Sequence, residues 1–368
     1  MTGIGVSAVT PYTAHREWAS RPPDERYASV HALYEAARAR RHRIEERTIE
    51  TGTFRTEALD TDDLVMRESS GRTAALTHWS FGQLATIAAA PPQYLRSLPA
   101  TIASDAINHG LQRVQHDHHQ VFAEDAAPWT VHAITSPRYA RVHHDELASR
   151  VLDLMAVHPA WHLPLGYKDG VFGAERVPSG AYLGDRDMFL FLVDGNRDLD
   201  DLTDRTHSGL FRGFMLRNSD VGAAALTLDV FLFRMVCGNH IIWGFQHVAA
   251  FRRRHVGASI QAAWTTSLNE VRAALDADTA DDRARLLRTM SKELGSTSDA
   301  VVDMAVRRLD VSQKQAAEAY SLAEQHETNP RSVWGYVQGL TRLSQRTPWQ
   351  DGRFALDRAA SRLLITVD

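Results

Sequence analysis

The chain has 368 residues, of which 44% are hydrophobic and 23% are charged, and its formal net charge at pH 7 is −4. This composition is typical of a globular fold with a buried core and excludes wholesale disorder. The length allows one large domain or two. The negative net charge excludes a protein that coats nucleic acid over its whole surface, but it allows a local basic patch.

The cellular compartment follows from three features of the sequence. The amino terminus lacks a basic start followed by an apolar run, so we expect no secretory signal. The most apolar stretch, residues 221–244, is interrupted by Asp229, Arg234 and Asn239, which a membrane span should not carry. The only cysteine, Cys237, has no partner for an internal disulfide. We therefore expect a cytoplasmic protein without a membrane partner.

The first part of the chain predicts an irregular arm followed by a helix. Residues 1–26 are rich in Pro, Gly, Ser and Thr, which favour turns over regular structure. From Tyr27 to Glu50 apolar residues recur at helical spacing and a strongly charged end follows, so we predict a helix there. Gly52 is a plausible stop signal for this helix.

The next two helices are separated by prolines. Thr77 or Ser80 is a suitable cap for a helix that Pro91-Pro92 ends. A second helix is predicted from about Ala100 to Gln115. The pair imitates a helix-turn-helix, but the second helix lacks the basic surface of a DNA-reading helix. Packing is therefore the favoured interpretation.

From Val121 onward the pattern indicates short strands. WTVHAIT alternates in the way of a half-buried strand, and SPRYARV then turns into a helix from Asp145 to Val157. Three later segments, MFLFLVDG, GLFRGFMLRNS and AALTLDVFLFRMVCGN, are rich in Phe, Val, Leu and Thr and are separated by Gly, Asp or Asn. They predict neighbouring antiparallel strands.

After His255 the pattern is helical to the end of the chain. Ser312 with Gln315 forms a plausible capping box. Five helices are predicted, at Ala258–Asp276, Asp281–Leu294, Asp299–Leu309, Ser312–His326 and Ser332–Gln345. The fold class is thus α+β, with a central, mostly antiparallel sheet, helices before it and a helical C-terminal region. We expect the arm at 1–26, a mixed core domain at 27–257 and the helical region at 258–368.

Four segments together resemble a phage/plasmid-like family of unknown function, number nine hundred and thirty-two among such families. They are ALTHWSFGQLATIAAAPPQYLRSLP, ITSPRYARVHHDEL, LRNSDVGAAALTLDVFLFRMVCGNHI and ETNPRSVWGYVQGLTRLSQRT. The second is similar to the family's Ser-x-x-Tyr turn before a helix. The third is similar to its Asn-Ser-x-x-Gly strand, which Arg-x-Val-Cys-x-Asn follows. The resemblance covers about residues 75–365.

The resemblance implies a mobile-element context and no particular reaction, because the biochemistry of the family is undefined. Asn239-His240 departs from the Asn-Thr or Asn-Gly that is frequent in the family after the cysteine. This departure weakens any role assigned to that pair.

Histidines and carboxylates gather at two places and invite a metal interpretation. His116 and His118 lie in QHDHHQ, and His143-His144 precedes Asp145-Glu146. A chain with 18 histidines produces such clusters by chance, so these four histidines are weak metal candidates.

Motifs of catalysis and of cofactor binding are missing from the sequence. GVFGAERVPSG lacks the spacing of a phosphate-binding loop, and there is no Gly-x-Ser-x-Gly and no His-Glu-x-x-His. Cys237-x-x-His240 has no second matching pair for zinc, so core packing is favoured for the cysteine. We therefore expect no cofactor, and an enzyme is the less favoured reading.

A basic stretch provides the favoured functional hypothesis. From residue 205 to residue 254 the chain has seven arginines and two aspartates, a net charge of +5. Aromatic residues are interleaved, as in a groove where arginines contact phosphates and rings stack on bases. The alternative is that the aromatic residues are core and the arginines form ordinary surface ion pairs. The candidate residues for nucleic-acid binding are Arg138, Tyr139, Arg141, Arg212, Arg217, Asn218, Arg234, Arg252, Arg253, Arg254 and His255.

Three hypotheses of function follow. The first is a nucleic-acid-binding protein of phage or plasmid origin, with single-stranded DNA as the favoured ligand and annealing or protection of DNA as its role. The second is a metal-dependent enzyme that uses the histidine and carboxylate cluster. The third is a protein-interaction module of a mobile element, or a homo-oligomeric scaffold, in which Trp334, Tyr336, Val337 and Leu340 on one side of a helix form the partner surface.

Overall fold

The computed structural model describes most of the chain. Backbone is described for residues 22–59, 63–125, 129–167, 175–195, 210–236, 239–243, 251–253, 255, 269, 280–347, 356, 359–360 and 362–364. Within these ranges the side chains of residues 166–167, 176, 210–212, 229–236, 239–243, 251–253, 280–283, 285–286 and 345 are left out. The helix predicted at Ala258–Asp276 thus falls outside the described residues except for Asn269, as does nearly all of the predicted N-terminal arm.

The helix predicted from Tyr27 to Glu50 is shorter than expected. After the short 3-10 helix η1 (Pro23–Glu25), α2 covers Val30–Arg43, and the Ser29 side chain caps it by accepting a hydrogen bond from the Ala32 backbone N–H. The chain then continues as β1 (Ile44–Glu50). Tertiary pairing decides this change, because every residue of β1 pairs with a residue of the antiparallel strand β5 (His118–Glu124).

The first sheet has six strands, in the order β1-β5-β6-β4-β3-β2, and only β4 and β6 pair in parallel. Its remaining strands and its 3-10 helices are β2 (Phe54–Ala58), β3 (Leu64–Glu68), β4 (Thr73–Leu76), β6 (Thr130–Thr135), η2 (Thr51–Thr53) and η3 (Gln112–Val114). Strands β2, β3 and β4 were not predicted from the sequence, whereas β6 was predicted correctly.

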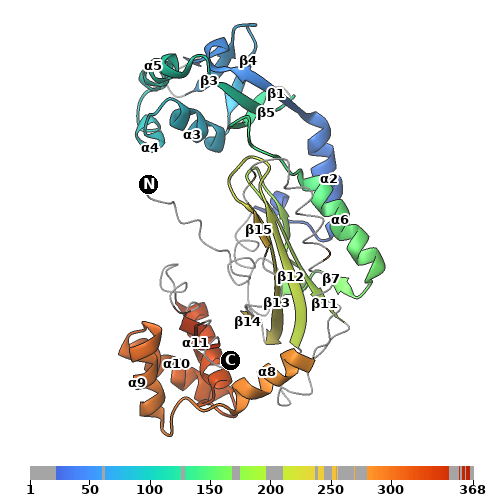
Figure 1. Cartoon of the computed structure of the whole chain (residues 1–368), viewed down its shortest axis with the longest axis vertical. Helices are drawn as coiled ribbons and strands as arrows, with labels where there is room; N and C mark the ends of the chain where they lie inside the picture. The colour runs from blue at the N-terminus through green and yellow to red at the C-terminus, as the bar shows by residue number, and fades with distance from the viewer. Residues whose placement is uncertain are drawn as a thin grey trace.

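Three helices pack against this sheet: α3 (His78–Ile87), α4 (Pro92–Leu95) and α5 (Ala100–Leu111) (Figure 1). The predicted start and end of α3 are confirmed, since the Thr77 side chain accepts a hydrogen bond from the Ser80 N–H and Pro91 follows the helix. The packing interpretation of α5 also fits, because Ala103, Ile107 and Leu111 are buried in the core beneath the sheet.

The second sheet is antiparallel throughout and follows the order β10-β11-β12-β13-β14. Beside this path, β7 pairs with β11 and β15 pairs with β13, while β8 and β9 form a separate ribbon. The strands are β7 (Trp161–His162), β8 (Leu165–Tyr167), β9 (Arg176–Pro178), β10 (Ala181–Leu183), β11 (Met188–Asp194), β12 (Leu210–Asn218), β13 (Leu226–Val236), β14 (Asn239–Trp243) and β15 (Phe251–Arg253). The predicted antiparallel neighbours β11, β12 and β13 are confirmed.

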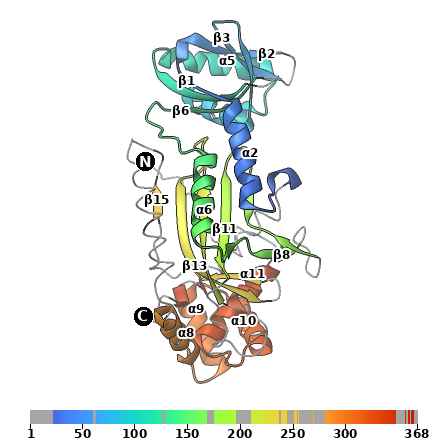
Figure 2. The ribbon, with the colours of Figure 1, turned by 90° about the vertical axis from the view of Figure 1, so that its right-hand side faces the viewer.

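Helices α2 and α6 (His144–Val157) lie side by side along one face of the second sheet (Figure 2). Val30 and Leu33 of α2 and Leu147 of α6 share one buried core with Leu190 and Leu216 of the sheet. The helix predicted at Asp145–Val157 is therefore confirmed to within one residue.

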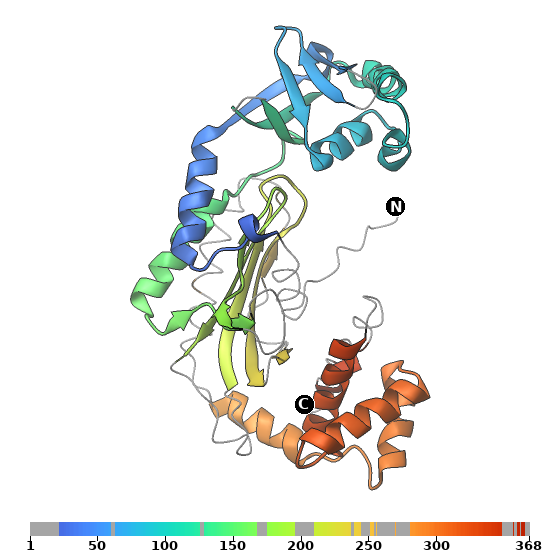
Figure 3. The ribbon, with the colours of Figure 1, turned by 180° about the vertical axis from the view of Figure 1, so that it is seen from behind.

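The C-terminal region is a helical bundle of α8 (Ala280–Ser291), α9 (Ser298–Leu309), α10 (Gln313–His326) and α11 (Val333–Arg346) (Figure 3). The capping box of Ser312 and Gln315 at the start of α10 is confirmed. The partner surface proposed on α11 is wrong, because its four apolar members are core residues of the bundle. Their exposed fractions do not exceed 4%, for Trp334, Tyr336, Val337 and Leu340.

The fold class is α+β, as predicted. The six-stranded sheet with α3, α4 and α5 lies at one end of the molecule, the second sheet in the middle and the helical bundle at the other end (Figure 1). In the part of the chain that the structure describes, every helix is too short or too polar to cross a bilayer.

Candidate functional site

Segments from three parts of the chain are joined where the first sheet meets the second. Trp79 and Gln83 of α3 both donate hydrogen bonds to the Val221 carbonyl oxygen, each across 2.9 Å. The Gln83 side-chain oxygen accepts a third bond, from the Ile134 backbone N–H of β6. Helix α3 is thereby fixed to the turn between β12 and β13, which lies next to it in the ribbon (Figure 1).

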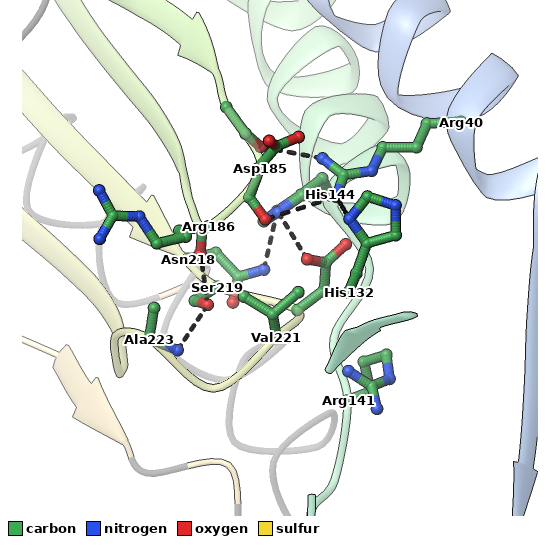
Figure 4. Close-up of polar contacts among 12 residues, drawn as sticks. Arg40, His132, Arg141, His144, Asp185, Arg186, Asn218, Ser219, Val221 and Ala223 are labelled. Carbon is green, nitrogen blue, oxygen red and sulfur yellow. Dashed lines mark hydrogen bonds and ion pairs between the residues drawn. The ribbon is translucent and has the colours of Figure 1, made fainter. Parts of the chain in front are cut away.

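The Asn-Ser-x-x-Gly sequence at residues 218–222 builds this turn. The buried Asn218 side chain donates to the Val142 carbonyl oxygen across 2.8 Å. Ser219 donates its hydroxyl proton to the Arg186 carbonyl oxygen and accepts a bond from the Ala223 N–H (Figure 4). Gly222 has a φ of +85°, a conformation that residues with a Cβ rarely adopt. The spacing of the motif thus follows from the shape of the turn.

His144 and Asp220 form a buried pair behind the turn. His144 Nε2 lies 3.1 Å from Asp220 Oδ1, and both side chains are nearly inaccessible to solvent. Burial alone would raise the pKa of Asp220, but His144 and nearby arginines hold it well below its usual range. The Asn218 amide also contacts His144 Nδ1, at 3.1 Å (Figure 4). The first residue of α6 is therefore tied directly to the end of β12.

Tyr139 closes the opposite side of the turn. Its hydroxyl donates to the Ser219 carbonyl oxygen across 2.7 Å, and burial raises the pKa of the Tyr139 phenol above its usual value. Its ring stacks on His255, with centroids 5.0 Å apart. Burial lowers the pKa of His255 to about 4, so the ring is neutral at pH 7. His255 Nδ1 lies 3.1 Å from the Ala140 carbonyl oxygen, which requires the proton to sit on Nδ1.

A cavity of about 630 Å³ opens at this junction, and we call it the junction pocket. It is lined by α3 and α4, the end of β6, the turn after β6, Arg186 and the turn between β12 and β13. The lining residues are His78, Trp79, Gly82, Gln83, Thr86, Ile87, Pro92, Arg96, Ile134, Thr135, Ser136, Tyr139, Arg186 and Gly222. Its walls combine aromatic and apolar side chains, such as Trp79, Ile87 and Ile134, with a few polar ones, a lining typical of ligand sites.

The lining of the junction pocket is positively charged. Its described residues include Arg96 and Arg186 and no carboxylate. Arg96 donates to the His78 carbonyl oxygen across 2.7 Å, while Arg186 is exposed and its side chain points away from the buried cluster around His144 (Figure 4). A third exposed arginine, Arg138, belongs to the turn that contributes Ser136 and Tyr139. An anion is the ligand that such a rim favours.

Two arginines of the predicted nucleic-acid site are committed to ion pairs. Arg217 contacts the buried carboxylate of Asp187 at 2.9 Å. The Arg141 side chain is 4% exposed, contacts Glu46 at 3.0 Å and lies over the Phe122 ring. Neither guanidinium is available to a phosphate. Asn218 is likewise buried and builds the turn, as described above.

The strand register does not place the other predicted arginines on one face. In the ladder of β12, β13 and β15, position 217 pairs with position 227, which in turn pairs with position 252. Position 253 pairs with position 226. Positions on one strand alternate between faces, so 217 and 252 share one face and 212, 234 and 253 share the other. The side chains of Arg212, Arg234, Arg252 and Arg253, and all of Arg254, lie outside the described residues. The backbone thus contradicts the single continuous track that the hypothesis assumed.

The histidines proposed as metal ligands are distributed over separate places. His116 contacts Glu50 at 2.9 Å, His143 contacts Glu46 at 3.1 Å, and His144 faces Asp220. Glu46 and Glu50 are four residues apart on β1, about 13 Å along the strand. His118 is exposed at the start of β5. Within the described residues, no three His, Cys, Asp or Glu side chains are arranged to hold a metal ion.

Most residues that form the walls of the pocket, and the two arginines of its lining, were not predicted from the sequence. Trp79, Gln83 and Arg96 lie in the first segment that resembles the phage/plasmid-like family, but they read as parts of packed helices. Arg186 lies in an acidic loop and had no signal of its own. Tyr139 and Arg138 are the predicted residues that adjoin the pocket, and His255 supports Tyr139 from behind.

Comparison of the chain with protein-family models, with curated proteins and with solved structures gave no match. The resemblance to the phage/plasmid-like family therefore stays a prediction.

Proposed function

We propose that this chain binds single-stranded nucleic acid, with DNA as the favoured ligand, and that the junction pocket receives an unpaired base. The observation that carries the proposal is the composition of the pocket. Trp79 and Tyr139 are in its walls, and the lining residues that the structure describes include two arginines and no carboxylate. Aromatic walls and guanidinium groups are the two components of sites that bind single strands.

The volume of the pocket supports a ligand of nucleotide size. Sites for small molecules and cofactors range from about 300 to 1,000 Å³, and the junction pocket has about 630 Å³. A base inside a duplex is stacked and paired, so it does not reach such a recess without leaving the helix. An unpaired base needs no such step. The pocket therefore favours a single strand over a duplex.

The predicted resemblance to the phage/plasmid-like family also favours the junction pocket as the binding site. Three of the four resembling segments meet in the pocket: the first supplies Trp79, the second Tyr139 and the third Gly222. A mobile-element origin and a cytoplasmic location, both proposals, fit a protein that protects or anneals DNA. The proposal relies on Arg96, Arg138 and Arg186 for DNA binding, in place of the arginines of β12, β13 and β15.

Fluorescence anisotropy with a labelled single-stranded oligonucleotide, titrated with salt, tests the proposal. The double variant Arg138→Gln/Arg186→Gln should bind more weakly than the unchanged chain at low salt. Its slope of log affinity against log salt should be shallower by about 1.4, because each lost phosphate contact removes about 0.7. Arg307→Gln/Arg308→Gln is the matched control, since it also removes two exposed arginines, which belong to α9 and do not line the pocket.

Two results would contradict the proposal. One is a lack of binding at low salt. The other is equal weakening of binding by the Arg307→Gln/Arg308→Gln control, which would indicate attraction by the charge of the whole protein rather than by this site.

A further inference from the structure

Several polar side chains of the junction pocket already form hydrogen bonds within the protein. The Trp79 ring N–H donates to Val221, and both ends of the Gln83 amide have backbone partners. The Tyr139 hydroxyl donates to Ser219, and the Thr86 hydroxyl donates to Gly82. These bonds use the single ring N–H of Trp79 and the hydroxyl protons of Tyr139 and Thr86, so these three groups are already engaged as donors.

Thr135 is the exception among the buried polar groups of the pocket. It is 8% exposed, and its hydroxyl oxygen has no hydrogen-bond partner in the described part of the chain. Its Cγ2 lies 3.7 Å from the place that a Cβ on Gly222 would take, and Gly222 is part of the pocket wall. In the rotamer that the structure shows, the Thr135 hydroxyl oxygen is buried. A rotation of about 120° about χ1 would move it into the position of Cγ2, next to a ligand at this wall, and threonine adopts more than one such rotamer.

We infer that the pocket accepts any unpaired base with little preference for its identity, and that Thr135 supplies a hydrogen bond to the base edge. A hydroxyl both donates and accepts, so it satisfies either kind of group on a base. Stacking on an aromatic wall is equally tolerant, because every base has a π face. This inference rests on the proposed function and adds the ligand class: the base of a single strand, irrespective of sequence.

The test compares four probes: oligonucleotides of deoxythymidine, of deoxyadenosine and of deoxycytidine, and an abasic strand of the same length. The three base-bearing strands should bind with affinities within about threefold of one another. The abasic strand should bind at least about tenfold more weakly, because it loses the stacking contribution. A preference of more than tenfold for one base would overturn the inference, and so would equal binding of the abasic strand.

The Thr135→Val variant separates recognition from folding, because valine has the same shape without the hydroxyl. It should weaken binding of all three base-bearing strands by a similar factor, about three- to tenfold, and leave the abasic strand unchanged. Its midpoint of thermal unfolding should not fall, since no internal hydrogen bond is lost. A lower midpoint with unchanged affinities would show a structural role for the hydroxyl and overturn its assignment.

These outcomes distinguish the two proposals. If no probe binds, or if the abasic strand binds as well as the others, the proposed function fails. If the base-bearing strands bind better than the abasic strand but differ more than tenfold among themselves, the pocket for an unpaired base stands and only the lack of base preference fails.

Discussion

The Tyr139 hydroxyl donates a hydrogen bond to the carbonyl oxygen of Ser219 across 2.7 Å, although the two residues are 80 positions apart in the chain. This bond fixes the turn after β6 to the turn between β12 and β13. Both turns contribute to the junction pocket, through Tyr139 itself and through Gly222. The shape of the pocket therefore depends on a contact between the two sheets.

Replacement of Tyr139 by phenylalanine should reduce the free energy of unfolding by about 1 kcal/mol, because the buried Ser219 carbonyl loses a neutral donor. The stacked ring on His255 is kept, so nucleic-acid affinity should fall only slightly. Tyr139→Ala should weaken binding much more, since it also removes a wall of the pocket. Urea denaturation and anisotropy measure the two effects. Equal affinities of the two variants would contradict a role for the ring.

Asn218→Asp should destabilise the protein by about 2 kcal/mol or more. An ionised aspartate cannot donate to the Val142 carbonyl oxygen, and it adds a negative charge in the buried region that already holds Asp220. Chemical denaturation at pH 7 measures the loss. A variant as stable as the unchanged chain would contradict the view that Asn218 holds the turn to the segment before α6.

Gly222→Ala has a matched control in Gly71→Ala. The two glycines have φ values of +85° and +88°, so an alanine at either site should cost about 1 kcal/mol of backbone strain. The new Cβ at 222 would lie 3.6 Å from side-chain atoms of Gln83 and Tyr139, whereas nothing lies within 4 Å at 71. Both variants should lose similar stability, but only Gly222→Ala should bind nucleic acid more weakly. Equal affinities would place the ligand elsewhere.

The stability of the protein should decrease as the pH falls from about 6.5 to 4. Burial lowers the pKa of His255 to about 4 in the folded chain, from an ordinary value of 6.5. The unfolded chain therefore binds a proton in this interval that the folded chain does not, which favours unfolding on the order of 3 kcal/mol in all. His255→Asn should be less stable at pH 7 but should flatten this dependence. The prediction would be contradicted if the stability of His255→Asn fell between pH 6.5 and 4 as steeply as that of the unchanged chain.

The stability of the protein should decrease in a second, lower pH interval as well. Burial alone would raise the pKa of Glu46, but its contacts with His143 and Arg141 lower it to about 2, from an ordinary 4.5. The stability from these contacts is present above pH 4.5 and is lost as the pH falls toward 2. His255→Asn should not affect this lower interval.

The sequence predicted elements whose signals are local. The cap at Thr77, the prolines after α3 and the capping box of α10 act within a few residues, and each is confirmed. Strand β1 was missed because its charged sequence, IEERTIE, forms a strand through pairing with β5 rather than through its own pattern. Periodicity on α11 predicted an apolar side, but it could not tell a partner surface from a core.

The candidate site was harder to predict, because its residues come from distant segments. The charge of Arg217 and Arg141 was visible in the sequence, but their partners Asp187 and Glu46 are 30 and 95 residues away. Asn218 and Tyr139 were found as motif residues, although their roles are to shape the turn and the pocket wall. The Arg186 backbone is held at the pocket by Ser219, 33 residues away, which donates a hydrogen bond to its carbonyl oxygen.

Photochemical crosslinking tests the central claim most directly. A single-stranded oligonucleotide with 5-iodo-deoxyuridine reacts with aromatic side chains that stack on the base, and mass spectrometry then identifies the residue. We expect adducts at Trp79 or Tyr139, and their loss when an unlabelled single strand competes. Adducts confined to residues outside the junction pocket, such as Tyr320 of the helical bundle, would contradict it.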